Sequence, residues 1–189
     1  MSILVLETAR LILKPLNHED IEVYERLFAE YEVIRYLSTN VPWPYPKGEC
    51  ENYLTTRIFP NQGIDQWMWG IFVKDRQKNR LGALIGAIHL WRKGIPENRG
   101  FWLTKTEWGK GYMTEACEAV NHFAFEQLAF EELIFSNAVG NAGSRRVKEK
   151  TGCEFIGREP CEFVDPAFNE RELWKLSLSS WLTWVNRVQ

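Results

Sequence analysis

Trp108-Gly109-Lys110-Gly111-Tyr112-Met113-Thr114-Glu115-Ala116 is the stretch that decides the fold, because a strand-like run ends before it and a long helix follows. Residues 99–103 have the composition of a β-strand. After the glycines, apolar residues recur at steps of three and four, which predicts one buried helix face: Met113, Ala116, Cys117, Val120, Ala124 and Leu128. The two glycines therefore lie where a helix begins.

The start of this helix predicts an anion-binding turn. The first amide N–H groups of a helix have no intrahelical acceptor, and the helix dipole adds a partial positive charge there. Ser, Asp or Asn usually caps such a start, but none stands between Trp108 and Tyr112. Glycine lets the backbone approach a ligand, and a phosphate group suits several amides at once. An ordinary tight turn remains the alternative for a Gly-x-Gly pair alone.

The same stretch excludes two nucleotide-binding classes. It lacks the third glycine of the dinucleotide fingerprint, and Tyr112 follows Gly111 where a P-loop needs Lys and then Ser or Thr. Nucleotide kinases and nicotinamide-dependent dehydrogenases are thereby disfavoured. A pyrophosphate bound without a metal or a nicotinamide remains.

Length and charge predict one globular domain over residues 1–189. The chain has 189 residues, of which 45% are hydrophobic, enough for one substantial core. Its formal net charge of −2 gives no general attraction for nucleic acid or anionic membranes, and we expect neither as a partner. A local group of basic residues could still face a phosphorylated ligand: Arg145, Arg146, Lys148 and Lys150.

Cysteine and histidine usage predicts a reduced, metal-free protein. Cys50, Cys117, Cys153 and Cys161 form no Cys-x-x-Cys pair, and His18, His89 and His122 lack metal-ligand spacing. No apolar run approaches the ~18 residues of a membrane span. We therefore expect a soluble, cytoplasmic protein without a metal.

The remaining sequence predicts an α+β protein. In the first half we expect a strand at 10–16, a helix capped by Asn17 or Asp20, helical pieces at 30–37 and 49–59, and a hairpin of strands 66–73 and 81–91 with a charged turn at 74–80. The proline-rich loop 41–48 is either a rigid cover over the core or one wall of an acceptor pocket that uses Trp43 and Tyr45.

The second half predicts a strand–helix–strand unit around the glycine turn, with strands at 98–104 and 132–138 and locally parallel pairing between them. A helix at 141–150 and strands from 155 and at 172–178 follow. The C-terminal helix carries Leu178, Trp181, Leu182, Val185 and Val188 at helical steps. We expect this face to dock on its own domain or on a second copy.

A second motif runs from Asn141 to Gly157, with Asn-x-x-Ser at its start and Lys150-Thr151-Gly152 at the end of its helix. Together with the glycine turn, it resembles the GNAT family of acetyl-CoA-dependent N-acetyltransferases, and within it the ribosomal-protein N-terminal acetyltransferases. Residues 6–11 and 42–45 are similar to that branch too, so the resemblance covers about residues 6–178. It implies a mixed, mostly antiparallel central sheet of about seven strands with helices on both faces, followed by a C-terminal helix at about 179–188.

The resemblance also implies a cofactor site for acetyl-CoA. The pyrophosphate would lie on the amides of the glycine turn, with these cofactor-binding residues: Trp108, Gly109, Lys110, Gly111, Tyr112, Met113 and Thr114. The backbone near Leu103 would pair with the pantetheine arm in a gap between two strands. Asn141 would hydrogen-bond the cofactor, or instead cap its helix. Met113 replaces the usual Ala or Gly and either crowds the cofactor or points into the core; Lys105 and Cys153 are further departures.

Two catalytic roles follow from the resemblance to the ribosomal-protein branch. Many members of the family protonate the leaving thiolate with a tyrosine, but every tyrosine here lies at or before Tyr112. The ribosomal-protein branch has a serine in this role, so Ser144 would be the proton donor. Glu162 would take the proton of the attacking amine, directly or through a water, unless it is only a solvated loop charge. An amine attacks a thioester only when neutral, and an α-amino group with a pKa near 8 is already partly so.

These expectations describe an N-acetyltransferase that acts on a protein N-terminus or a small-molecule amine by direct attack in a ternary complex, as a monomer or homodimer. Cys117 and Cys153 have core-like positions, so no acyl-enzyme is expected. Two alternatives stay open. One is an acyl-CoA-binding protein without turnover, and the other is an interaction module that uses the Trp-rich surface and the C-terminal helix.

Overall fold

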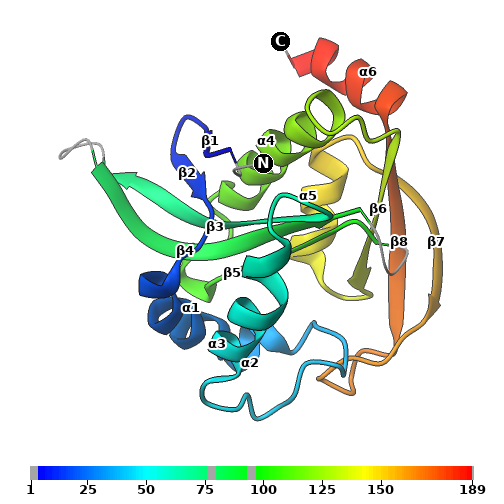
Figure 1. The fold of residues 1–189 in the computed structure, drawn as a ribbon. Helices are drawn as coiled ribbons and strands as arrows, with labels where there is room; N and C mark the ends of the chain where they lie inside the picture. The colour runs from blue at the N-terminus through cyan, green and yellow to red at the C-terminus, as the bar shows by residue number, and fades with distance from the viewer. Residues whose placement is uncertain (1–3, 76–79, 93–96, 189) are drawn as a thin grey trace.

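The computed structural model describes residues 4–75, 80–92 and 97–188 and contains two antiparallel sheets (Figure 1). The first sheet has five strands in sequence order: β1 (Leu6–Glu7), β2 (Leu11–Lys14), β3 (Gln66–Asp75), β4 (Arg80–Trp91) and β5 (Arg99–Leu103). The second has the order β6 (Glu132–Ala138), β8 (Glu170–Ser177) and β7 (Glu154–Pro160). The predicted α+β class is confirmed, with eight strands in the described residues where about seven were expected.

Helices cover both faces of the first sheet (Figure 1). One face carries α1 (Ile21–Phe28), α2 (Tyr31–Ile34) and α3 (Glu49–Tyr53), which continues through a wider turn at Leu54–Ile58. The other face carries α4 (Tyr112–Glu126), with α5 (Ala142–Lys150) beside it and α6 (Leu178–Val188) near its C-terminal end. No helix in the described ranges has the length and apolar character that a membrane crossing requires.

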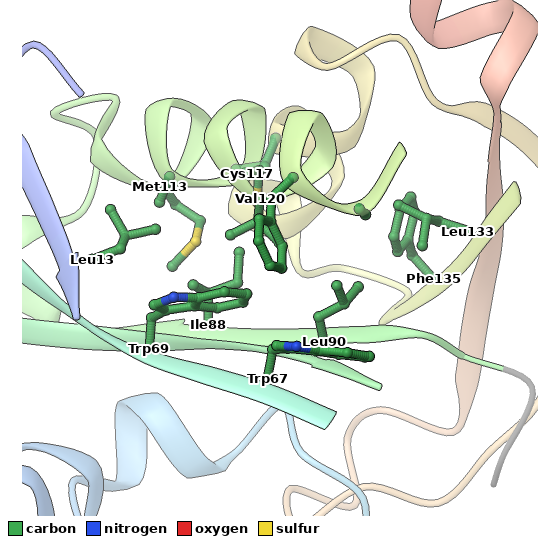
Figure 2. Close-up of a cluster of buried hydrophobic side chains, with 14 of the residues drawn as sticks. Leu13, Trp67, Trp69, Ile88, Leu90, Met113, Cys117, Val120, Leu133 and Phe135 are labelled. Carbon is green, nitrogen blue, oxygen red and sulfur yellow. The ribbon is translucent and has the colours of Figure 1, made fainter. Parts of the chain in front are cut away.

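The strand periodicity of β3 builds a core on each side of the sheet. Because successive side chains of a strand point to opposite faces, Trp67 and Trp69 contact α4 while Met68 packs on the α1 side. Figure 2 shows Trp69 and Ile88 of the sheet beneath the apolar stripe of α4. This packing holds the start of α4 at a fixed place beside β5.

The two sheets separate where β5 meets β6. At one end, the Asn98 amide donates to the Ile134 carbonyl over 2.8 Å, and the Ile134 amide donates to Asn98 Oδ1 over 2.8 Å. Beyond this point the two strands belong to different sheets. The predicted parallel pairing is therefore wrong: β6 pairs along its length with β8, and within the described residues no strand pairs with the outer edge of β5. This separation opens the space in which the predicted site lies.

The C-terminal helix docks on its own domain. Trp181 is buried and stacks with Trp184 at a ring distance of 5.1 Å, and Val185 contacts the same core. The predicted face was partly wrong, because Leu178 and Leu182 are exposed. The side chain of Val188 and the centre of the predicted 74–80 turn, residues 76–79, lie outside the described residues.

Candidate cofactor and catalytic site

A cavity of about 730 Å³ lies where the sheets separate. Its walls come from β5, the glycine turn and first residues of α4, β6, the start of α5, and residues 33–40 at the end of α2. The turn, Asn141 and Ser144, which are distant in the sequence, line this same cavity. The two predicted motifs thus meet in one site.

The glycine turn has the geometry that anion binding requires. Gly109 and Gly111 have φ angles of 76° and 82°, in the left-handed region where other residues are strained. Gly111 is the N-cap of α4 and no side chain caps the helix, so its first amides remain available. A Cβ added at Gly109 would meet no atom within 4 Å, so the turn faces open space. This turn fits a pyrophosphate group.

Residues near the N-terminus hold this turn in place. Glu115, in the first turn of α4, accepts from Thr8 Oγ1 over 2.5 Å and from Arg10 Nε over 2.6 Å. Arg10 Nη1 also donates to the Lys110 carbonyl over 2.9 Å. Burial alone would raise the pKa of Glu115, but the hydrogen bonds from Thr8 and Arg10 outweigh it and lower that pKa. These contacts keep the Glu115 carboxylate charged and hold it beside the turn.

The side chains of two predicted cofactor residues are engaged by other parts of the protein. Lys110 does not line the cavity, because its ammonium group pairs with Glu107 at 3.0 Å; its amide belongs to the turn. Met113 is buried, and Figure 2 shows its side chain pointing from α4 toward Trp69 and Leu13. The side chain therefore occupies the core and does not crowd the turn.

Trp108 and Leu103 connect the turn to the strand. The indole Nε1 of Trp108 donates to the Leu103 carbonyl over 2.8 Å, and both residues line the cavity. This bond fixes the angle at which β5 leads into the turn. The outer edge of β5 beyond it faces the gap between the sheets, as a pantetheine arm would need.

Asn141 caps α5, and this leaves part of its side chain free for a ligand. Its Oδ1 accepts from the Ser144 amide over 3.0 Å. Because an Asn side chain also carries a donating Nδ2, the cap and a hydrogen bond to a cofactor are compatible. The helix start places Ser144 on the cavity wall.

The structure buries Lys148, which the sequence only grouped with basic residues that could face a phosphorylated ligand. Lys148 lines the cavity, is only 1% exposed, and donates from Nζ to Ser144 Oγ over 2.8 Å. Burial, and after it the positive charge of Arg99, lowers the pKa of Lys148 to about 7. The four-residue spacing from Ser144 was the available signal, since residues i and i+4 of a helix are neighbours.

Arg99 and Glu97 are polar groups of the cavity that the sequence did not indicate, whereas Arg146 and Lys150 belong to the predicted basic group. Arg99 is buried, donates from Nη1 to Asn121 Oδ1, and lies over the Phe135 ring at 4.0 Å. Glu97 accepts from Ser136 Oγ over 2.8 Å and pairs with Arg171. Arg146 and Lys150 are exposed at the cavity wall, where cations can meet a phosphorylated ligand.

Besides Lys110, three predicted residues lie outside the cavity lining. Trp43 is 43% exposed and its ring contacts Tyr31 at 5.1 Å, and the Tyr45 ring packs on Phe28 at 5.2 Å. The proline loop therefore covers α1 and α2, while residues 33–40 before it form the wall. Glu162 is exposed, and its side chain makes no hydrogen bond or ion pair within the described residues. Its neighbours Cys161 and Phe163 line the cavity. Alternation along an extended segment turns Glu162 outward.

No cluster of His, Cys, Asp or Glu in the described ranges has a metal-binding arrangement. All four cysteines are free. Cys117 is fully buried and Cys161 lines the cavity. Burial raises the pKa of Cys117 to about 11 and also raises the pKa of Cys161, so both thiols are protonated at neutral pH.

A sequence comparison decides the family. The family described as the acetyltransferase (GNAT) domain matches residues 10–154. The chain belongs to the GNAT family. Its glycine turn and the Asn141–Ser144 segment both lie within the matched region, whereas Cys161, Phe163 and Arg171 on the cavity wall lie beyond it.

Known proteins resemble this GNAT chain in sequence and in fold. YdaF of Bacillus subtilis (strain 168), which has the provisional name ribosomal N-acetyltransferase, is 42% identical over 74 residues, or 38% of this chain and 40% of YdaF. The chain thus matches less than half the length of this relative. RimL, a ribosomal L7/L12 alpha-N-protein acetyltransferase solved with coenzyme A, has a TM-score of 0.75 at 15% identity over 93% of this chain and 99% of RimL.

A Vibrio cholerae spermidine N-acetyltransferase, solved with coenzyme A and spermine, has a TM-score of 0.73 at 19% identity over 93% of this chain and 99% of that one. At these identities the two structural likenesses establish the shared fold. The predicted GNAT family is confirmed, and the partial match to YdaF agrees with the predicted ribosomal-protein branch.

Proposed function

We propose that this GNAT chain transfers the acetyl group of acetyl-CoA to a primary amine by direct attack in a ternary complex. The observation that carries the proposal is the uncapped glycine turn, which opens into the same cavity as Ser144. One cavity thus has amides for a pyrophosphate at one end and a hydroxyl group near the reacting region.

Different residues of the chain would bind the cofactor, orient it and supply a proton. Backbone amides from Gly109 to Thr114 would hold the pyrophosphate, with Arg146 and Lys150 adding positive charge at the wall. Asn141 Nδ2 and the outer edge of β5 near Leu103 would orient the pantetheine arm. Bound acetyl-CoA supplies the thioester. Ser144 would protonate the leaving sulfur, and the cavity walls would hold the two substrates in a reacting orientation.

We propose a protein N-terminus as the acceptor, as the name of YdaF suggests, with a polyamine as the alternative suggested by the spermidine N-acetyltransferase. The test is an acetylation assay with peptides that start with Ala, Ser or Met and with spermidine, read by mass spectrometry. One added acetyl group per peptide supports the proposal. Thiol release no faster than spontaneous hydrolysis on every acceptor would instead support an acyl-CoA-binding protein without turnover.

Direct transfer predicts that no cysteine is a nucleophile. Cys117→Ala, Cys153→Ala and Cys161→Ala should each keep kcat within about threefold of wild type, because the burial-raised pKa of each thiol disfavours the nucleophilic thiolate. Initial rates with both substrates varied should give intersecting reciprocal plots. Parallel lines, or loss of turnover in one folded variant, would point to an acyl-enzyme.

Glu162 remains the proposed base, acting through water because its side chain lies outside the cavity lining. Glu162→Gln should lower kcat/KM most at low pH, where more of the acceptor amine is protonated and needs help to lose its proton. The measurement is a pH profile of both proteins from pH 5.5 to about pH 9, spanning the α-amino pKa near 8. Superimposable profiles would remove Glu162 from the mechanism. The neutral fraction of the α-amine would then react without a base.

A further inference from the structure

Lys148 is a buried cation next to the proposed proton donor. Its side chain lines the cavity and donates from Nζ to Ser144 Oγ over 2.8 Å, while only 1% of the residue is exposed. Lysine is almost never buried to this degree unless another group compensates its charge. The contact with Ser144 therefore calls for a physical reason.

The groups that face Lys148 give it no carboxylate partner in the described ranges. Arg99 on β5 repels it, and the thiols of Cys117 on α4 and Cys153 after α5 face it as well. The Phe101 ring lies 5.5 Å from its Nζ. Glu172 on β8 is the acidic group that acts on Lys148, at longer range.

Glu172 is already neutralised by other residues. Its Oε1 pairs with Arg145 at 2.9 Å and with Arg158 at 3.2 Å, and its Oε2 accepts from Asn137 Nδ2 over 3.1 Å. Within the described residues, the hydrogen-bond acceptor of the Lys148 ammonium group is the Ser144 hydroxyl, which lies on the cavity wall. Burial and Arg99 disfavour the protonated form of Lys148. The Ser144 hydroxyl group, which lies on the cavity wall, could accept this proton and pass it to a ligand.

We propose that Lys148 is a positioning residue that supplies, through Ser144, the proton for the leaving thiolate; this inference rests on the proposed function. The amine nitrogen bonds to the thioester carbon and the C–S bond breaks with its electron pair on sulfur. Sulfur takes the proton of Ser144 Oγ, and Ser144 Oγ takes one from Lys148 Nζ. The neutral Lys148 then regains a proton from solvent, which balances the one that the acceptor nitrogen loses.

Acidities explain why such a relay is useful. A thiol has an unperturbed pKa of about 8.5, and a serine hydroxyl is a much weaker acid, so Ser144 alone is a poor donor to a thiolate. Lys148, whose pKa burial and Arg99 lower to about 7, is a stronger acid than the thiol. A proton that passes from Lys148 through Ser144 therefore moves downhill. The hydroxyl group orients the transfer and Lys148 makes it favourable.

The test compares kcat of Lys148→Met and wild type at each pH, because the ratio cancels the ionisation of the acceptor amine. Below pH 7 the variant should be about 100-fold slower, the lower range for general acid catalysis. The ratio should approach one as the pH rises and wild-type Lys148 loses its proton. The KM for acetyl-CoA should stay within about twofold, and Lys175→Met, on β8 outside the cavity lining, should behave as wild type. A ratio that does not change with pH would reduce Lys148 to a structural role and overturn the inference.

A double substitution tests whether the two residues act as one unit. If Lys148 works through Ser144, then Ser144→Ala should lower kcat, and adding Lys148→Met should lower it no further. Independent, multiplicative losses would contradict the relay. If the wild type acetylates no acceptor, the proposed function and this inference fall together, whereas a pH-independent ratio in an active enzyme removes the inference alone.

A measurement without turnover guards against loss of folding in the variants. In wild-type protein with ¹³C-labelled lysine, the Cε resonance of Lys148, assigned from its absence in Lys148→Met, should titrate near pH 7. Its midpoint should move in Ser144→Ala, where the hydrogen-bond partner is missing. A midpoint near 10, as in an exposed lysine, would overturn the proposal.

Discussion

Gly109→Ala is expected to weaken coenzyme A binding at least about 30-fold, or roughly 2 kcal/mol. The wild-type residue has a φ of 76° and no atom within 4 Å of where a Cβ would stand, so the added methyl group would occupy the space proposed for the pyrophosphate. The backbone would also be strained in the left-handed region. Isothermal titration calorimetry with coenzyme A measures the effect.

Gly48→Ala is the matched control for this variant. Gly48 has a φ of 83°, also has no atom within 4 Å of an added Cβ, and is the N-cap of the short helix α3, outside the cavity lining. Both substitutions should cost about 1–2 kcal/mol of stability from backbone strain. Only Gly109→Ala should lose binding. Equal affinities in the two variants would show that the turn does not hold the pyrophosphate.

Lys148→Met is expected to stabilise the protein at neutral and acidic pH. Burial and Arg99 lower the pKa of Lys148 to about 7 from 10.5, and each pKa unit is worth about 1.4 kcal/mol. The charged form therefore costs about 3–5 kcal/mol, and the lost hydrogen bond to Ser144 offsets about 1 kcal/mol of the gain. At pH 6 the net gain should be about 2–4 kcal/mol, or a melting temperature higher by about 5–10 °C.

The pH dependence identifies the cause. The folded-state pKa lies below the unfolded one, so between about pH 7 and pH 10.5 the unfolded chain binds more protons and wild-type stability rises with pH. The advantage of the Lys148→Met variant should be full below pH 7 and disappear through that window. Lys150→Met, at an exposed position of the same helix, should show no such trend. An advantage that is constant with pH would mean that packing, and not charge burial, is the source.

A buried lysine that destabilises the fold is more easily understood if it serves the reaction. Stability is often lower at positions that function requires. The stability and kinetic effects of Lys148→Met should therefore have opposite signs below pH 7.

The local motifs could be predicted because each depends only on residues that are close together in the sequence. The positive φ angles of Gly109 and Gly111 and the missing cap of α4 follow from the residues of one short stretch. The cap at Asn141 likewise depends on its own helix start. The family resemblance joined the two motifs, and the separated sheets place them around one cavity.

Tertiary packing decided the positions that could not be predicted. The sequence allowed the rings of Trp43 and Tyr45 to lie either at the cavity or on the outer helices. In the structure they pack on Tyr31 and Phe28, outside the cavity. Lysine is usually exposed, and Lys148 is buried only because α5 packs against β5 and α4.

Register is a second limit on sequence-based prediction. In the segment from Cys161 to Phe163, a shift of one position exchanges inward and outward side chains. The bridge between Ser38 and Phe163 sets that register, and it joins parts of the chain that are far apart in sequence. Glu162 was therefore predictable as a residue near the site, but the direction of its carboxylate was not.

The most direct test of the central claim is a ¹H–¹⁵N NMR titration of the wild-type protein with acetyl-CoA. The account predicts that the amides of Gly109, Gly111 and Thr114 shift to saturation, while those of Gly48 and Gly63, which also have positive φ but lie outside the cavity lining, stay unchanged. Unmoved turn amides at saturating acetyl-CoA, or shifts confined to another surface, would contradict it.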